Sequence, residues 1–311
     1  MVEEFFDLNK VTTYSLAERT NKVSIADFVT LKQEFSLQGF LDSLPTQLAG
    51  KDFRQLLRNW AAALKRASPV ILMMGAHVIK CGLSPMVIDL IRRGYITAVA
   101  FNGAGAIHDF EIGYQGATSE EVSDGLKTGN FGMAEETGRL INLCWQEHGA
   151  SGAGYALGRL IATSDYPYRD QSILAAAYQA EIPLTVHIAL GTDIIHQHPT
   201  ASGEAIGQAS FLDFKRFISV VQKLQGGVLI NFGSAVILPE VFLKALTTAR
   251  NCGQVVNDFT TANFDMIYHY RPRVNVVNRP TETGGDGFNF IGQHELLFPL
   301  VYYGILTEME S

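Results

Sequence analysis

The chain has 311 residues, 47% hydrophobic and 18% charged, which suffices for a full hydrophobic core and excludes a disordered protein. A net charge of −7 gives no general reason to bind nucleic acid or an anionic membrane, and it would attract a cationic substrate. No apolar run reaches the about 18 residues of a membrane span, and the three scattered cysteines do not suit a disulfide framework or a structural zinc site. The N-terminal sequence lacks a basic stretch followed by an apolar core, so we expect a cytoplasmic protein.

The first part of the chain reads as helical. Apolar residues recur at helical spacing in SIADFVTLKQEF (residues 24–35) and TQLAGKDFRQLLRNWAAALKRA (residues 46–67), and no strand-like run interrupts them. From Pro69 onward, apolar runs alternate with helical patterns. We therefore predict a helical N-terminal extension over residues 1–67 and one catalytic domain over residues 68–311.

The alternating part predicts an α/β fold with a doubly wound, mainly parallel, Rossmann-like sheet. The predicted strands are Val70–Met74, Ile96–Phe101, Leu184–Ala189, Val228–Phe232 and Val255–Phe259. The predicted helices are Pro85–Arg93, Glu120–Leu126, Met133–Glu147, Ser172–Ala180, Phe211–Leu224, Pro239–Arg250 and a last one over Glu295–Leu306.

Two strands run directly into turns of small and ionisable residues. The first turn is GAHVIKCG, in which Gly75 and Ala76 let backbone approach a ligand and His77 and Lys80 add polar groups. A second such turn follows the next predicted strand. In a parallel sheet the two turns lie side by side at the carboxyl ends of the strands, where nucleotides bind. The alternative is an ordinary tight turn from strand to helix.

The second turn is NGAGAIHDFE. Its small residues, Asn102–Gly105, could let a dinucleotide lie against backbone, although the pattern is not GxGxxG. His108 follows, with Asp109 and Glu111 close by, an arrangement suited to proton transfer or to holding an amine. A helix cap would explain Asp109 without any function.

The third strand leads into a segment rich in histidine. His187 lies within the apolar run, Asp193 lies beyond it, and His196 and His198 form a possible metal pair. Because no adjacent Asp, Glu or Cys completes a close ligand set, we expect no metal site.

Two later segments carry further candidate residues. TTANFD supplies Thr261 and Ala262 after the last predicted strand. The glycine-rich stretch before the final helix is either a surface loop or part of a site, and its polar residues are Arg279, Glu282, Asp286, His294 and Glu295. No GxSxG elbow, Walker A loop or HExxH helix is present, so common hydrolases and P-loop enzymes lack support.

These residues resemble the deoxyhypusine synthase family, and its bacterial deoxyhypusine-synthase-like members most. The resemblance rests on GAHVIKCGLSP, NGAGAIHDFE, TTANFD, and the Arg-Pro followed by a Phe-Pro-Leu helix. It implies NAD binding in a Rossmann-like domain and a homotetramer, a dimer of dimers with active sites between paired subunits. It also implies oxidation of the polyamine spermidine and transfer of its aminobutyl group to an acceptor amine, with a protein acceptor left open.

The resemblance also implies roles for individual residues. Together with the small residues of the two turns, the implied cofactor-binding set is Gly75, Ala76, His77, Asn102, Gly103, Ala104, Gly105, Gly233, Thr261, Ala262, Gln293 and His294. His108 falls where the family has a glutamate at the cofactor and polyamine site, and Asp193 falls where an aspartate holds a polyamine nitrogen.

Two departures from the family pattern bear on the mechanism. The family's lysine, which forms a covalent imine, lies in a Trp-Gly-Lys segment that is missing here, and no lysine follows Lys244. The family's polyamine-site histidine is missing too, since Leu238 and Pro239 lie near its place. The usual covalent route is therefore not expected.

Three functions remain open from the sequence. The first is an NAD-dependent amine-transferring enzyme with His108 as the base, whose amine anchors would be Asp109, Asp193, Glu282 and Glu295. Lys80 is either an alternative nucleophile or a phosphate contact. The second is a catalytically silent NAD-binding protein. The third is a metal-dependent hydrolase that would use the histidines His108, His187, His196 and His198.

Overall fold

The structure is a computed structural model that describes residues 5–30 and 36–310. The chain divides into two compact units, residues 1–51 and residues 52–311. Helix α2 (Leu48–Lys65) begins in the first unit and continues in the second. The domain boundary expected at residue 67 stays a prediction.

The described part of the first unit consists of short elements. They are η1 (Leu8–Lys10), η2 (Leu16–Glu18), η3 (Ile25–Asp27), α1 (Leu37–Ser43) and the start of α2. The helix expected over residues 24–35 is wrong where it can be compared, since residues 28–30 are not helical and residues 31–35 lie outside the described part. The Asp27 carboxylate accepts from the Ser24 N–H at 2.9 Å and from the Thr46 hydroxyl at 3.1 Å, which closes a single turn.

The second unit is built on one sheet of parallel strands. Its strands are β1 (Val70–Met74), β2 (Ala98–Asn102), β3 (Leu184–His187), β4 (Val228–Phe232), β5 (Thr260–Asp265) and β6 (Asp286–Ile291). Their order is β3-β2-β1-β4-β5-β6, and every neighbouring pair is parallel. This is the order of a doubly wound dinucleotide-binding sheet, so the predicted Rossmann-like α/β fold is confirmed.

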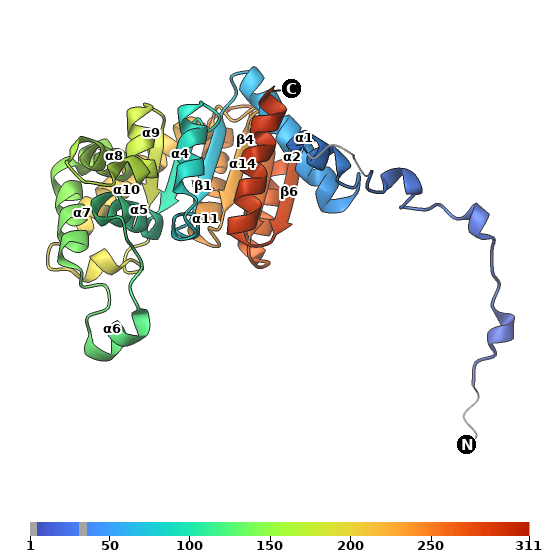
Figure 1. Cartoon of the computed structure of the whole chain (residues 1–311), viewed down its shortest axis with the longest axis horizontal. Helices are drawn as coiled ribbons and strands as arrows, with labels where there is room; N and C mark the ends of the chain where they lie inside the picture. Colours follow the sequence, from blue (N-terminus) through green and yellow to red (C-terminus); the bar gives the residue numbers. More distant parts are fainter. Residues whose placement is uncertain (1–4, 31–35, 311) are drawn as a thin grey trace. The chain divides into compact units, whose positions relative to one another are not determined.

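Helices lie on both sides of this sheet (Figure 1). Those that follow the first strands are α3 (His77–Lys80), α4 (Ser84–Arg92), α5 (Gly103–Gln115), α6 (Val122–Thr128), α7 (Glu135–His148), α8 (Ala153–Thr163) and α9 (Ile173–Gln179). The later ones are α10 (Gly203–Val221), α11 (Ile237–Asn251), α12 (Tyr270–Pro272), the π-helical η7 (Arg273–Asn278), α13 (Arg279–Thr281) and α14 (His294–Glu310). The short 3₁₀ turns are η4 (Gly149–Ser151), η5 (Arg169–Gln171) and η6 (Ile194–Gln197).

The strands are buried on both faces, which is why they read as continuous apolar runs. On one face, α10, α11 and η7 cover every second strand residue, namely Ile71, Met73, Ala98, Ala100 and Leu229. On the other face, α4 and α9 contact each other, and α14 contacts α4. No helix among the described residues is long and apolar enough to cross a membrane.

Polar side chains also pair across the sheet. Asn231 of β4, Asn263 of β5 and Asn289 of β6 are in register, with amide–amide hydrogen bonds of 2.8 and 2.9 Å between neighbours. Asn231 also donates to the Ser234 carbonyl at 2.9 Å, which fixes the turn after β4. The next residue of each strand is Phe232, Phe264 or Phe290, and their rings stack at 4.6 and 4.7 Å.

These pairs explain where the predicted strands are wrong. Val255–Phe259 is not a strand, because the backbone N–H groups of Asn257 and Asp258 bind the Gln225 side chain. The strand is TTANFD itself, which was not recognised because its polar residues interrupt the apolar pattern. The glycine-rich segment after it forms the edge strand β6. Helices α3, α5 and α8 were not foreseen.

Candidate active site

The carboxyl ends of β1 and β4 meet at the switch point, where the strand order reverses. Here two glycines approach each other: a Cβ added to Gly75 would lie 2.7 Å from the carbonyl oxygen of Gly233. Gly233 has a φ of 71°, which disfavours any residue with a side chain. In sheets of this order, dinucleotides bind just beyond this point, where close backbone approach is needed.

His294, the first residue of α14, is buried directly beside Gly233. A Cβ on Gly233 would lie 2.5 Å from the His294 ring, and the ring packs at 5.5 Å from His77 and at 5.2 Å from Phe232. His294 is only 1% exposed, and neither ring nitrogen meets the geometry of a hydrogen bond among the described residues, although the backbone of Phe264 is close enough to raise the pKa of the ring. Burial lowers the pKa of His294, so the ring is neutral at neutral pH.

The end of β5 supplies a second buried polar group next to β4. Asp265 is 4% exposed, and its Oδ2 has no hydrogen-bond partner among the described residues, although His269 Nε2 lies 3.9 Å from it. Unpartnered buried polar atoms cost free energy and call for an explanation, such as a ligand. Asp265 was not foreseen as a site residue, although it ends the strand that carries Thr261 and Ala262.

A pocket of about 500 Å³ opens at the same edge of the sheet, beyond β1, β2 and β3. Helix α5 contributes the residues that share one helical face, Ala104, Ile107, His108, Glu111 and Gln115. Lys80 of α3 and the segment Thr192–Ile194 line it as well, together with Thr118, Glu120 and Phe131. The structure thus brings His108, Lys80 and Asp193 to one pocket.

Asp193 lies against the start of α5. A Cβ on Gly103 would lie 1.9 Å from Asp193 Oδ2, so only glycine fits there. This oxygen is buried and unpartnered, and burial raises the pKa of Asp193 to about 6. Asn102 is the N-cap of the same helix, since its side chain accepts from the Gly105 N–H at 2.8 Å. A carboxylate at this helix start favours a cation nearby and disfavours a pyrophosphate.

His108 belongs to a chain of polar contacts inside the pocket. Its Nδ1 lies 2.6 Å from the Thr118 hydroxyl, and that hydroxyl donates to Glu111 Oε2. Glu111 Oε1 accepts from the Thr137 hydroxyl of α7 at 2.9 Å. Burial lowers the pKa of His108, with Lys80 acting in the same direction and Glu111 against it. Neither Thr118 nor Thr137 was foreseen as a site residue.

Asp109 lies outside the pocket although it follows His108 directly. One residue turns an α-helix by about 100°, which points Asp109 into the core. Its carboxylate accepts from the Ser172 hydroxyl at 2.5 Å and from the N–H groups of Ile173 and Leu174 at 2.8 and 2.9 Å. Asp109 therefore caps α9, and we leave it out of the proposed site.

Other predicted residues do not line the pocket. Glu282 is exposed and precedes β6, the edge strand on the far side of the sheet from β3. Thr261 and Ala262 lie buried within β5 rather than at its end. Gln293 and Glu295 flank His294 and are exposed, and Glu295 Oε2 lies 3.8 Å from Cys81 Sγ, beyond the first turn.

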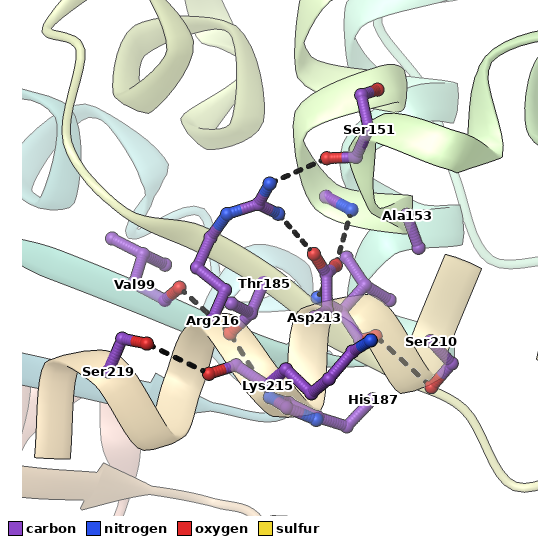
Figure 2. Close-up of polar contacts among 12 residues, drawn as sticks. Val99, Ser151, Ala153, Thr185, His187, Ser210, Asp213, Lys215, Arg216 and Ser219 are labelled. Carbon is purple, nitrogen blue, oxygen red and sulfur yellow. Dashed lines mark hydrogen bonds and ion pairs between the residues drawn. The ribbon is translucent and has the colours of Figure 1, made fainter. Parts of the chain in front are cut away.

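The end of β3, which leads to Asp193, is held by a buried aspartate of α10. Asp213 accepts from the N–H groups of Gly154 and Val186 at 2.7 and 2.8 Å and from Arg216 at 2.5 Å (Figure 2). Arg216 also donates to the Ser151 carbonyl at 2.6 Å, so this cluster joins β3, α10 and the start of α8.

The remaining histidines of this region have structural partners. His187 pairs with the Thr185 hydroxyl at 3.1 Å (Figure 2), and burial lowers its pKa to about 3. His196 Nδ1 accepts from the Asp193 N–H at 3.3 Å, and His198 Nε2 lies 2.7 Å from the Gly132 carbonyl. Among the described residues, no group of three or more His, Cys, Asp or Glu could hold a metal ion. The hydrolase alternative therefore has no ligand set there.

The comparisons with known proteins show a fold relation. No protein-family model and no curated protein matches the chain. Among solved structures, ArgZ, an arginine dihydrolase from the ornithine–ammonia cycle in cyanobacteria, aligns at TM-score 0.51 and 14% identity over 85% of this chain and 34% of its own. A conserved putative LOR/SDH protein from Methanococcus maripaludis S2 aligns at TM-score 0.51 and 13% identity over 84% of this chain and 71% of its own.

A complex of AgrE with ornithine and NAD⁺ aligns at TM-score 0.50 and 14% identity, covering 86% of this chain and 35% of AgrE. The chain thus spans about a third of the length of ArgZ and AgrE. A putative deoxyhypusine synthase from Entamoeba histolytica aligns at TM-score 0.48 and 10% identity, over 88% of this chain and 94% of its own. Likeness at these identities establishes the α/β fold alone.

Asp193→Asn is predicted to stabilise the protein at pH 7. Because the pKa of Asp193 is raised from 3.8 to about 6, the folded state binds this proton more tightly, and stability falls as pH rises from about 4 to 6. The full shift corresponds to about 3 kcal/mol, which partial exposure and the start of α5 reduce to about 1–2 kcal/mol.

Urea denaturation of the wild type and the variant, below pH 4 and at pH 7.5, measures this gain. Asparagine should give a more stable protein at pH 7.5 and an unchanged one below pH 4. Asp165→Asn, at an exposed position, is the matched control and should change neither value. A loss of stability at pH 7.5 in Asp193→Asn would show that the carboxylate supports the fold.

Proposed function

We propose that the chain is an NAD-dependent enzyme that oxidises a small cationic, polyamine-like amine and transfers its aminoalkyl group to an amine acceptor. The observation that carries this proposal is the buried His294, whose two ring nitrogens have no hydrogen bond of good geometry among the described residues and which lies at the switch point of a dinucleotide-type sheet. The pocket with His108 and Asp193 lies at the same edge of that sheet.

The residues around the switch point fit a dinucleotide. Gly75 and Gly233 let the two backbone turns approach each other closely, while His294 and Asp265 place buried polar atoms without a hydrogen-bond partner among the described residues beside them. His77 lies at the rim of this group, since its ring contacts that of His294. When bound, NAD would accept a hydride from the amine carbon. That AgrE, with the same fold, was solved with NAD⁺ and ornithine supports a site for both ligands in one protein.

The charges of the pocket suit a cation. Asp193, Glu111 and Glu120 contribute carboxylates, whereas Lys80 is the cation among the lining residues. Asp193 Oδ2 in particular has no partner among the described residues, and an ammonium group would satisfy it. We therefore assign Asp193 as the amine anchor in place of Asp109 and Glu282.

His108 is assigned as the base. Oxidation of an amine removes a hydride from carbon and a proton from nitrogen, which leaves an imine; the neutral His108 ring would take the proton. The acceptor amine would then attack the imine carbon and displace the original amine, and the new imine would need reduction by the same hydride to become the transferred aminoalkyl product.

The absence of any lysine after Lys244 favours direct attack by the acceptor over a covalent enzyme imine. Lys80 lines the pocket and is exposed, so it remains the alternative nucleophile. A homotetramer of paired subunits and a protein acceptor stay predictions from the family resemblance.

His294→Phe is predicted to weaken NAD⁺ binding at least tenfold without lowering stability. Phenylalanine keeps the packing against Phe232 and Gly233 but removes two buried nitrogens that have no partners, which should leave the fold equally or more stable. Calorimetric titration with NAD⁺ and urea denaturation measure the two effects.

His187→Phe is the matched control, since His187 is equally buried but pairs with Thr185 away from the switch point. This variant should keep the NAD⁺ affinity and lose stability. If His294→Phe retains full affinity for NAD⁺, His294 does not belong to a cofactor site.

A panel of polyamines, diamines and basic amino acids, assayed with NAD⁺, tests the activity itself. We expect NADH formation with at least one cation, and mass spectrometry should find the aminoalkyl product when an acceptor amine is added. Because ionised Asp193 holds the cation, KM should fall as pH rises through about 6 in the wild type and stay flat in Asp193→Asn. Tight NAD⁺ binding with no reduction by any amine would instead identify a silent NAD-binding protein.

A further inference from the structure

We infer that Thr118 and Glu111 hold His108 in one tautomer, with its proton on Nδ1 and the lone pair on Nε2, so that the ring is built to accept a proton. Thr118 and Glu111 are thus positioning residues. The role of His108 as the base rests on the proposed function, whereas the tautomer follows from the hydrogen bonds to an ionised Glu111.

The assignment comes from counting protons along the contacts. A threonine hydroxyl has one proton to donate. Thr118 donates it to Glu111 Oε2, so at its 2.6 Å contact with His108 Nδ1 the Thr118 oxygen must be the acceptor. Nδ1 therefore carries the proton. No described residue hydrogen-bonds to Nε2, and the side chain lines the pocket.

The contacts of Glu111 decide in which direction the protons are donated along this chain of hydrogen bonds. Glu111 Oε1 accepts from the Thr137 hydroxyl at 2.9 Å, so both oxygens of Glu111 receive a donor. An ionised carboxylate accepts only, whereas a protonated one would have to give a proton to Thr118 or Thr137. Two hydroxyl donors suit the ionised form, and the proton order then runs from His108 through Thr118 to Glu111.

Three separate segments converge to make this arrangement. His108 and Glu111 lie one turn apart on α5, and Thr137 comes from α7. Thr118 comes from the loop after α5, which turns back at Gly116, where φ is 76° and a Cβ would lie 2.8 Å from the Tyr168 ring. The turn that this glycine permits brings Thr118 to the His108 ring.

The charged groups that face His108 set the direction of its titration. Glu111 on α5 raises the pKa of the ring and Lys80 on α3 lowers it, while burial lowers it most. Asp193 before η6 and Glu120 in the loop after α5 line the same pocket. The balance keeps the ring neutral at neutral pH, as a proton acceptor requires.

Nitrogen-15 NMR of histidine-labelled full-length protein, without NAD or amine, tests the tautomer. The chain has 8 histidines, and His108→Gln identifies the signals of His108 by their loss. The neutral wild-type ring should show Nδ1 protonated and Nε2 unprotonated. Thr118→Val should reduce this preference to a mixture, and Thr118→Ser, which keeps the hydroxyl, should restore it.

Thr128→Val is the matched control, because Thr128 lies on α6 and bonds only carbonyls of its own helix. It should leave the His108 signals unchanged. A wild-type ring protonated on Nε2, or a Thr118→Val spectrum identical to that of the wild type, would overturn the inference.

The pH titration of the same signals gives a second readout. Glu111→Gln removes the nearby negative charge and should move the His108 titration about one pH unit lower, whereas Lys80→Met should move it higher. Shifts in the same direction, or none, would contradict the assignment. Because no cofactor or amine is present, a failed amine panel leaves this result intact, and a failed tautomer test leaves the amine panel intact.

Discussion

The close approach of two backbone turns, at Gly75 and Gly233, is the constraint on which the proposed site depends. The sheet ladder continues one residue beyond each strand, with the Gly75 N–H donating to the Phe232 carbonyl and the Gly233 N–H to that of Phe264, both at 3.0 Å. No side chain fits between the two turns, and the described side chain nearest to a Cβ on Gly233 is the buried His294 ring of α14. Backbone, the buried His294 ring and the buried Asp265 carboxylate thus form this part of the proposed site.

The pocket beside the switch point is lined by charged side chains and suits a different ligand. Asp193 reaches the start of α5 because residue 103 is glycine, and its carboxylate lies where other sheets of this type accept a phosphate. We therefore propose two neighbouring ligand sites beyond the carboxyl ends of the strands: one for a dinucleotide beyond β1 and β4, and one for a cation beyond β2 and β3. Reaction between an amine and a nicotinamide needs both sites next to each other, which the strand order provides.

The sequence predicted the parts of this arrangement that depend on apolar runs. Strands such as Val70–Met74 are buried on both faces, so their continuous apolar runs are easily recognised in the sequence. The turn after each such strand was correctly placed at the carboxyl end of that strand. TTANFD was missed as a strand because Asn263 pairs sideways with its neighbours, which no local pattern reveals. Asp109 was expected beside His108 and Thr118 was not foreseen, because helix rotation and a glycine turn decide which side chains reach the His108 ring.

The central claim is that a dinucleotide binds beyond the ends of β1 and β4 while the α5 pocket stays free for an amine. A crystal structure of the protein soaked with NAD⁺ tests this most directly. We predict density for the dinucleotide over Gly75 and Gly233, with a polar atom within hydrogen-bonding reach of a His294 nitrogen. A dinucleotide bound in the α5 pocket against Asp193, or none at saturating NAD⁺, would contradict the account.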